Sequence, residues 1–204
     1  MQIKVCGLKH NIAEIANIKN IDYLGFIFYK FSARCVNNNQ LHQILSVSQK
    51  KKVAVFVDED CQTIERTCKL YRINTVQLHG DETPEFCFNL KEKGFNVIKA
   101  FAIDDSFDFN VIKAYTTVCN YFLFDTKGPL KGGNGKKFSW SVLEKYALNT
   151  PFFLSGGIEL SDVENIKTFR HPMFYGVDVN SGFETSPGNK NEALIKIFIK
   201  HVKN

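Results

Sequence analysis

Two glycine turns near the end of the sequence have the residue types of a phosphate-binding site. Ser155-Gly156-Gly157 follows the apolar run Phe152-Phe153-Leu154, and Asp178-Val179-Asn180-Ser181-Gly182 follows the run Phe174-Tyr175-Gly176-Val177. Because each turn leads into a helix-like segment, its backbone N–H groups have no helical acceptor and can bind an anion. Glycine also lets the backbone approach a ligand and adopt positive φ. We therefore expect the two turns to converge on one phosphate group.

Five further side chains at the ends of predicted strands could do chemistry: Cys6, Arg34, His79, Asp125 and Asp178. A thiol and a carboxylate that face one phosphate site make an acid–base pair, although cysteine is more commonly a small buried hydrophobic residue and aspartate a loop cap. Arg34 has the planar fork that binds carboxylates, but exposed loop arginines are common. We expect His79 to orient a loop and Asp178 to brace the last turn.

Composition indicates a globular protein with one domain over residues 1–204. The chain of 204 residues is 44% hydrophobic with 19 phenylalanines, which excludes disorder. No apolar run approaches the ~18 residues of a membrane span. An apparent strand begins within two residues of Met1 and leaves no room for a signal peptide, so we expect a cytoplasmic protein without a membrane partner.

Cysteine spacing and charge exclude two other classes of protein. The six cysteines form no CxxC pair or metal-ligand pattern, which predicts reduced thiols and no metal site. The net charge of +5 is mild and suits a small anionic substrate. The run Lys50-Lys51-Lys52 has no interleaved aromatic residues, and we interpret it as a solvated loop and not as a nucleic-acid site.

The chain that must position these residues alternates strand and helix patterns. The predicted strands are 3–5, 24–28, 53–57, 75–78, 96–100, 121–124, 152–154 and 174–177. Five predicted helices cover 39–47, 61–71, 84–93, 108–117 and 191–202. Three more begin at Asn11, Ser139 and Ser161.

About eight strand–helix units without a linker predict one parallel (β/α)8 barrel. An open doubly wound sheet is the alternative, but the phosphate turns then lie at the wrong end of the chain, and no GxGxxG follows the first strand. In a barrel, chemistry lies at the C-terminal ends of the strands, where all the residues above are found.

Several motifs spread over the whole chain can be compared with known families. They are Lys4-Val5-Cys6-Gly7-Leu8, Val76-Gln77-Leu78-His79-Gly80, Phe124-Asp125-Thr126, Gly132-Gly133-Asn134-Gly135-Lys136-Lys137-Phe138-Ser139-Trp140, Leu154-Ser155-Gly156-Gly157-Ile158 and Gly176-Val177-Asp178-Val179-Asn180-Ser181-Gly182-Phe183-Glu184 with Pro187-Gly188. Each motif alone is weakly specific, but together, in order, they are highly specific. They resemble one family, the phosphoribosylanthranilate isomerases of tryptophan biosynthesis.

The resemblance implies an aldose–ketose isomerase that performs an Amadori rearrangement. The substrate would be N-(5-phosphoribosyl)anthranilate and the product 1-(2-carboxyphenylamino)-1-deoxyribulose 5-phosphate, formed without a cofactor or metal. Asp125 matches the family's general acid, which protonates the ring oxygen and opens the sugar to a Schiff base. Cys6 matches the general base, which takes the C2 proton. Such roles require a stabilised thiolate and a carboxylic acid that stays protonated.

The resemblance also assigns the substrate-binding residues. Arg34 would bind the anthranilate carboxylate, and the phosphate would rest on the backbone of Gly156, Gly157, Ser181 and Gly182, with Asp178 beside it. His79 and Lys127 would support the site, and Lys127 with the stretch Gly132 to Gly135 resembles a mobile cover. The sequence departs from the family pattern at Ala33, Cys35 and Asn191, two of which flank the substrate arginine.

Two other functions fit part of this pattern. A related sugar-phosphate isomerase or epimerase would keep the phosphate turns and change the acid–base pair; the histidine-pathway isomerase is expected to have an aspartate where Cys6 stands. A non-catalytic phosphate-binding barrel would need neither Cys6 nor Asp125. Family members occur as monomers and homodimers, and the sequence is compatible with both.

Overall fold

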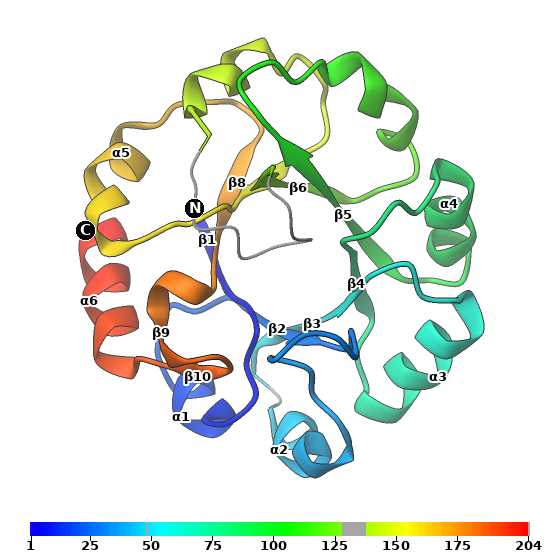
Figure 1. The fold of residues 1–204 in the computed structure, drawn as a ribbon, viewed down its shortest axis with the longest axis vertical. Helices are drawn as coiled ribbons and strands as arrows, with labels where there is room; N and C mark the ends of the chain where they lie inside the picture. The colour runs from blue at the N-terminus through cyan, green and yellow to red at the C-terminus, as the bar shows by residue number, and fades with distance from the viewer. Residues whose placement is uncertain (48, 128–137, 204) are drawn as a thin grey trace.

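The protein is a closed parallel barrel, seen in a computed structural model that describes residues 1–47, 49–127 and 138–203. Within these ranges eight strands pair in chain order, and β1 pairs with both β2 and β8 to close the ring (Figure 1). The predicted (β/α)8 fold is therefore confirmed, and the open sheet is excluded. The strands are β1 Gln2–Val5, β2 Tyr23–Ile27, β3 Lys51–Phe56, β4 Thr75–Leu78, β5 Asn96–Ile103, β6 Tyr121–Thr126, β7 Phe152–Leu154 and β8 Phe174–Val179.

Helical segments follow the strands and surround the barrel (Figure 1). The α-helices are α1 Ile12–Ala16, α2 Leu41–Ser46, α3 Cys61–Tyr71, α4 Pro84–Glu92, α5 Val163–Thr168 and α6 Glu192–Lys203. The 3-10 segments are η1 Asn38–Gln40, η2 Phe109–Tyr115, η3 Trp140–Lys145, η4 Leu160–Asp162 and η5 Ser181–Phe183. A short hairpin of β9 Glu184–Ser186 and β10 Asn189–Lys190 lies between η5 and α6.

Residue types at the helix ends explain where several helices begin. The Asp60 side chain accepts a hydrogen bond from the N–H of Thr63 at the start of α3, and Thr83 does the same for Phe86 at the start of α4, where Pro84 is the first helical residue. Asn11 precedes α1 but makes no such bond. Its amide instead pairs with the backbone of Lys190, which fixes the β9–β10 hairpin to the rim of the barrel.

The structure differs from the sequence-based expectation in several places, of which three matter here. The segments after β5 and β6 are 3-10 in form and not α-helical, because they are short and rich in aromatic, β-branched, Asn and Ser residues, which are weak α-helix formers. Strand β6 extends to Thr126, so that Asp125 belongs to the strand. The interpretation of Lys50–Lys52 as a solvated loop was wrong: β3 begins at Lys51, and the Nζ atoms of Lys50 and Lys52 bind backbone carbonyls.

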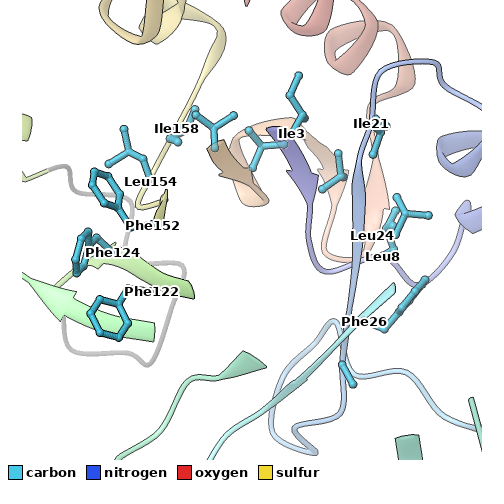
Figure 2. Packing of buried hydrophobic residues seen from close by; sticks show 14 of the residues in the cluster. Ile3, Leu8, Ile21, Leu24, Phe26, Phe122, Phe124, Phe152, Leu154 and Ile158 are labelled. Carbon is cyan, nitrogen blue, oxygen red and sulfur yellow. The ribbon is translucent and has the colours of Figure 1, made fainter. Parts of the chain in front are cut away.

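The core has two layers, one on each face of the barrel wall. The larger layer lies between strands and helices, and Figure 2 shows part of it, including Phe122 and Phe124 of β6 and Phe152 of β7. The rings of Phe124 and Phe152 are 5.0 Å apart between centroids. The smaller layer, inside the barrel, contains Cys6, Tyr23, Val53, Val55, Ile98, Ala100, Leu123 and Phe153. Period-two alternation along each strand separates the layers, and it places Cys6 inside the barrel.

No helix within the described ranges is both long and apolar enough to cross a membrane.

Candidate active site

A cavity of about 540 Å³ opens at the C-terminal end of the barrel. It collects side chains and turns at the C-terminal ends of β1, β2, β3, β4, β6, β7 and β8, as expected for the functional face of this fold. Nine predicted site residues line it: Cys6, Arg34, His79, Asp125, Gly156, Gly157, Asp178, Ser181 and Gly182. The structure therefore brings together all the predicted site residues except Lys127.

Lys127 lies outside this cavity. Its side chain is 65% exposed, and its Nζ lies 2.8 Å from Oδ2 of Asp104. The stretch Gly132 to Gly135, which the sequence pairs with Lys127 as a mobile cover, lies outside the described residues.

Cys6 lies beside a buried ion pair that the sequence analysis missed. Strand β1 pairs with β8 so that Lys4 is opposite Asp178, and Nζ of Lys4 is 2.8 Å from Oδ1 of Asp178. Lys4 is fully buried, and it shares the inner face of β1 with Cys6, two residues further on. The available signal was a lysine in the apolar run Ile3-Lys4-Val5, where a charge needs a partner.

The electrostatics of this pair act on the thiol. Burial raises the pKa of Cys6, while the Lys4 ammonium opposes that rise without cancelling it. Burial also raises the pKa of Asp178, again against the attraction of Lys4. Lys4 is thus the nearby cation that stabilises a thiolate at Cys6, whereas the Asp178 carboxylate disfavours it. Cys6 therefore lies close to a fixed positive charge.

Asp125 is at the end of a short hydrogen-bonded series across β4 and β6. Its Oδ1 accepts a hydrogen bond from the N–H of Thr126 at 2.8 Å, and its Oδ2 lies 3.3 Å from Nε2 of His79. The other ring nitrogen of His79, Nδ1, is 3.1 Å from Nε2 of Gln77. With the Gln77 amide as donor, Nδ1 of His79 accepts and Nε2 carries the proton that faces Asp125. The predicted supporting role of His79 therefore has a geometric basis, and Gln77 is an addition that the sequence analysis missed.

The two glycine turns lie side by side in the lining of the cavity. Gly156 and Gly157 have φ of +92° and +68°, and a Cβ on Gly156 would be 2.2 Å from Oγ1 of Thr126. A Cβ on Gly182 would be 2.5 Å from the carbonyl oxygen of Ile158, so the second turn packs directly against the first. Within the described part of the chain, the N–H groups of Gly156 and Gly157 have no hydrogen-bond acceptor. These N–H groups are available to an anion, as the sequence predicts.

Arg34 also lines the cavity, and its guanidinium is bound by Glu184 with 2.7 Å between Nη2 and Oε2. Lys190 binds the same carboxylate at 2.8 Å. Neither Glu184 nor Lys190 was singled out in the sequence, although Glu184 ends the last family motif and Lys190 follows Pro187-Gly188 by two positions. Both become recognisable only through the fold, since 150 residues separate Arg34 from Glu184.

The three departures from the family pattern have different structural consequences. Ala33 lines the cavity beside Arg34, so it shapes the site directly. Cys35 is outside the lining, where its Sγ lies 3.5 Å from the carbonyl oxygen of Val36. Asn191 accepts a hydrogen bond from the N–H of Leu194 at the start of α6, which is a helix-capping role.

Among the described residues, no group of three or more His, Cys, Asp or Glu side chains is arranged to hold a metal ion.

Known proteins share both the sequence and the fold. A model of the N-(5'-phosphoribosyl)anthranilate (PRA) isomerase family matches residues 3–201. The isomerase of that name from Parabacteroides distasonis is 43% identical over 207 residues, which cover 99% of this chain and 93% of the relative. The crystal structure of phosphoribosyl anthranilate isomerase from Thermotoga maritima has a TM-score of 0.87 at 33% identity and covers 100% of this chain and 98% of its own. Another such isomerase, solved in complex with reduced 1-(o-carboxyphenylamino)-1-deoxyribulose 5-phosphate, has a TM-score of 0.84 at 30% identity, with coverage of 100% and 98%. The chain belongs to the N-(5'-phosphoribosyl)anthranilate isomerase family.

Proposed function

We propose that this protein performs the family reaction, the Amadori rearrangement of N-(5-phosphoribosyl)anthranilate, with Asp125 as general acid and Cys6 as general base. Asp125 gives its proton to the furanose ring oxygen, and the C1–O bond breaks to leave a protonated Schiff base. The Cys6 thiolate then takes the proton from C2, and the electron pair of that C–H bond forms an enolamine. In the tautomerisation of the enolamine, the Cys6 thiol gives its proton to C1 and the 2-hydroxyl gives its proton to the Asp125 carboxylate, which yields the 2-ketone and returns both side chains to their starting states. Only protons and electron pairs move between these two side chains and the substrate, so the reaction as written requires no cofactor or metal.

The observation that carries this proposal is the placement of Cys6, directly after β1, and Asp125, on β6, in one cavity that the glycine turns also line. The phosphate rests on the backbone of Gly156, Gly157, Ser181 and Gly182, where free N–H groups face it. Its position fixes the sugar between the acid and the base, which supplies the orientation that the reaction needs.

Neighbouring side chains support the two catalytic groups. His79 directs its Nε2 at Asp125 and holds the carboxyl group in place. Lys4 supplies the positive charge that a thiolate at Cys6 needs, and Asp178 holds the Lys4 ammonium while it lines the sugar-binding part of the cavity. Arg34 binds the carboxylate of the anthranilate ring, because a guanidinium matches a carboxylate in both charge and geometry.

The test is a progress curve with freshly generated phosphoribosylanthranilate, followed by the loss of anthranilate fluorescence. Cys6→Ala and Asp125→Asn are each expected to lower kcat by about 100- to 10,000-fold, the range for loss of a general acid or base. Cys68→Ala is the matched control, because it also removes a buried thiol but from α3, on the outer side of the barrel. Full activity of a folded Asp125→Asn protein would remove Asp125 as the acid. Loss of fluorescence no faster than the spontaneous rate in the wild type would refute the reaction itself.

The remaining proposals concern the binding partner, the cellular compartment and the oligomeric state. A small phosphorylated substrate is the partner that the cavity suits, with no nucleic-acid or membrane partner, and the protein acts as a monomer or a homodimer. The six free thiols suit a reducing compartment such as the cytoplasm. Light scattering coupled to size-exclusion chromatography distinguishes the two assembly states by mass.

A further inference from the structure

A buried carboxylate at the mouth of the barrel binds two cations and has no part in the acid–base chemistry. Glu184 begins β9, and its side chain is only 5% exposed. Oε1 of Glu184 lies 2.8 Å from Nζ of Lys190 and accepts a hydrogen bond from the N–H of Gly188 at 3.0 Å. Nε of Arg34 donates to both carboxylate oxygens at 3.0 Å, and Nη2 donates to Oε2 at 2.7 Å.

The contacts with Glu184 use one edge of the Arg34 guanidinium and leave its other edge available to a ligand. A guanidinium has five N–H donors in a fixed plane. Glu184 takes the side edge formed by Nε and Nη2. The terminal edge, formed by Nη1 and the second N–H of Nη2, has no acceptor among the described residues, and Arg34 lines the cavity with 20% of its side chain exposed. A second carboxylate can therefore form a two-point contact with Arg34 only through this terminal edge while Glu184 stays in place.

Lys190 cannot play the same part. Its Nζ bonds to Oε1 of Glu184 at 2.8 Å, to Oδ1 of Asn180 at 2.7 Å and to the carbonyl oxygen of Asn180 at 3.2 Å. An ammonium group has three donors, so all three are in use. The side chain is also fully buried against this cluster. Of the two cations on Glu184, Arg34 is the one that still has donors for a ligand.

The charges of the cluster favour an additional anion. Glu184 carries one negative charge between two positive groups, so the three side chains together keep about one positive charge. Burial alone would raise the pKa of Glu184, but the hydrogen bond from Arg34 and the charge of Lys190 outweigh burial and lower it. Glu184 is thus ionised at neutral pH, and it holds Arg34 without cancelling the positive charge that faces the cavity.

Gly7, which follows Cys6, makes room for the Arg34 side chain in this cluster. Gly7 has φ of +73°, and a Cβ at this position would be 2.5 Å from Oδ1 of Asn180 and 2.7 Å from Cδ of Arg34. Gly7 therefore leaves the space through which the Arg34 stem passes. Arg34 is fixed at its stem by this close approach and at its head by Glu184.

We propose that Glu184 is a positioning residue that holds Arg34 so that the terminal edge of the guanidinium binds the carboxylate of the substrate's aromatic ring. The guanidinium lies between two carboxylates, one from β9 and one from the substrate. This inference rests on the proposed function, in which Arg34 is the carboxylate-binding residue. It makes Glu184 a determinant of specificity for substrates that carry an acidic group.

The experiment compares two substrates in Glu184→Gln: phosphoribosylanthranilate and phosphoribosylaniline, which lacks the carboxylate. Gln keeps the size of the side chain but loses its charge and one acceptor. We expect KM for phosphoribosylanthranilate to rise about 10- to 100-fold, the range for hydrogen bonds to a charged group, with a much smaller change in kcat. We expect KM for phosphoribosylaniline to change little. Glu184→Asp is expected to restore part of the discrimination, because it restores the charge.

Glu82→Gln is the matched control, since Glu82 is another buried carboxylate at the same end of the barrel. It lies 3.1 Å from Nζ of Lys99 and accepts hydrogen bonds from the N–H groups of Asp58 and Gly80. Its loss should affect both substrates to the same degree. Equal effects of Glu184→Gln on both substrates would reduce Glu184 to a structural residue and overturn the proposal. A lower KM for phosphoribosylanthranilate would also overturn it, because Glu184 would then compete with the substrate.

Arg34→Met in the same assay separates this proposal from the function on which it rests. If Arg34→Met removes the preference for the acidic substrate and Glu184→Gln keeps it, the role of Glu184 is refuted and that of Arg34 stands. If Arg34→Met leaves the preference intact, Arg34 is not the carboxylate-binding residue, and the proposed roles of Arg34 and Glu184 are both refuted.

Discussion

Replacement of Lys4 by methionine tests whether the buried ion pair holds the interior of the barrel together. At 2.8 Å between Nζ and Oδ1 of Asp178, and with an effective dielectric constant of about 20, the attraction is about 6 kcal/mol. Desolvation of both groups offsets part of that gain, but removal of one partner leaves the other charge buried. We therefore expect Lys4→Met to lower the free energy of unfolding by about 3–5 kcal/mol at pH 8.

The loss should depend on pH, with a sign that follows from Asp178. Its pKa is already raised by burial, and without Lys4 it rises further. The folded variant then binds a proton more tightly than the unfolded chain, whose aspartate pKa is about 3.9. Stability of the variant relative to the wild type should thus fall as pH rises from about 4 through the raised pKa of Asp178. Near pH 4 the two proteins should differ least.

Urea unfolding at several pH values measures this stability, and the pH dependence of kcat/KM measures the effect on Cys6. Because Lys4 lowers the pKa of the Cys6 thiol, loss of Lys4 should raise the apparent pKa of that thiol, as read from the activity profile. Lys99→Met is the control: Lys99 forms a comparable buried pair with Glu82, 3.1 Å away, outside the catalytic cavity. It should lose stability without moving the profile. Unchanged stability of Lys4→Met at pH 8, or an unmoved activity profile, would refute the reasoning.

Three smaller predictions concern the phosphate turn, a helix cap and Glu184. Gly156→Ala should raise KM and lower stability by about 1–2 kcal/mol or more, because φ is +92° and the new Cβ would meet Thr126; phosphate-analogue binding and urea midpoints measure both effects. Asp60→Ala should lower the melting temperature and leave kcat/KM unchanged, since it removes the acceptor for the N–H and the hydroxyl of Thr63 at the start of α3, and a thermal melt reports the loss. Glu184 has a lowered folded-state pKa, so the stability that its charge contributes is present above the unfolded value of about 4.3 and is lost as pH falls through the lowered pKa. Urea midpoints of Glu184→Gln and wild type should therefore converge at acidic pH, and a constant gap would contradict this account.

The sequence alone determined the barrel, the family and nine of the residues that line the cavity. Strand runs separated by helical patterns predict a parallel barrel, since parallel strands need crossover connections. In such a fold the C-terminal ends of all strands meet at one face, so Cys6 and Asp125 were predicted to face the same cavity without any knowledge of packing. The family resemblance, which the comparisons confirm, followed from motifs that are contiguous in the chain.

Prediction from the sequence was less successful where local conformational preference and tertiary contacts favour different structures. The lysine run at the start of β3 was interpreted as solvated, yet Lys50 and Lys52 direct their ammonium groups to backbone carbonyls. The η2 and η3 segments are short enough that packing on the barrel decides between α and 3-10 forms.

Only the tertiary structure decided which partners the charged residues have. Lys4 meets Asp178 because β1 closes the ring against β8 in one register, and a shift of one residue would turn Lys4 out of the barrel. Arg34 meets Glu184 because a hairpin 150 residues away folds over the same rim. Side-chain periodicity determines which face of a strand a residue occupies, but ring closure and loop packing bring together residues that are distant in the chain, and no local pattern encodes those distances.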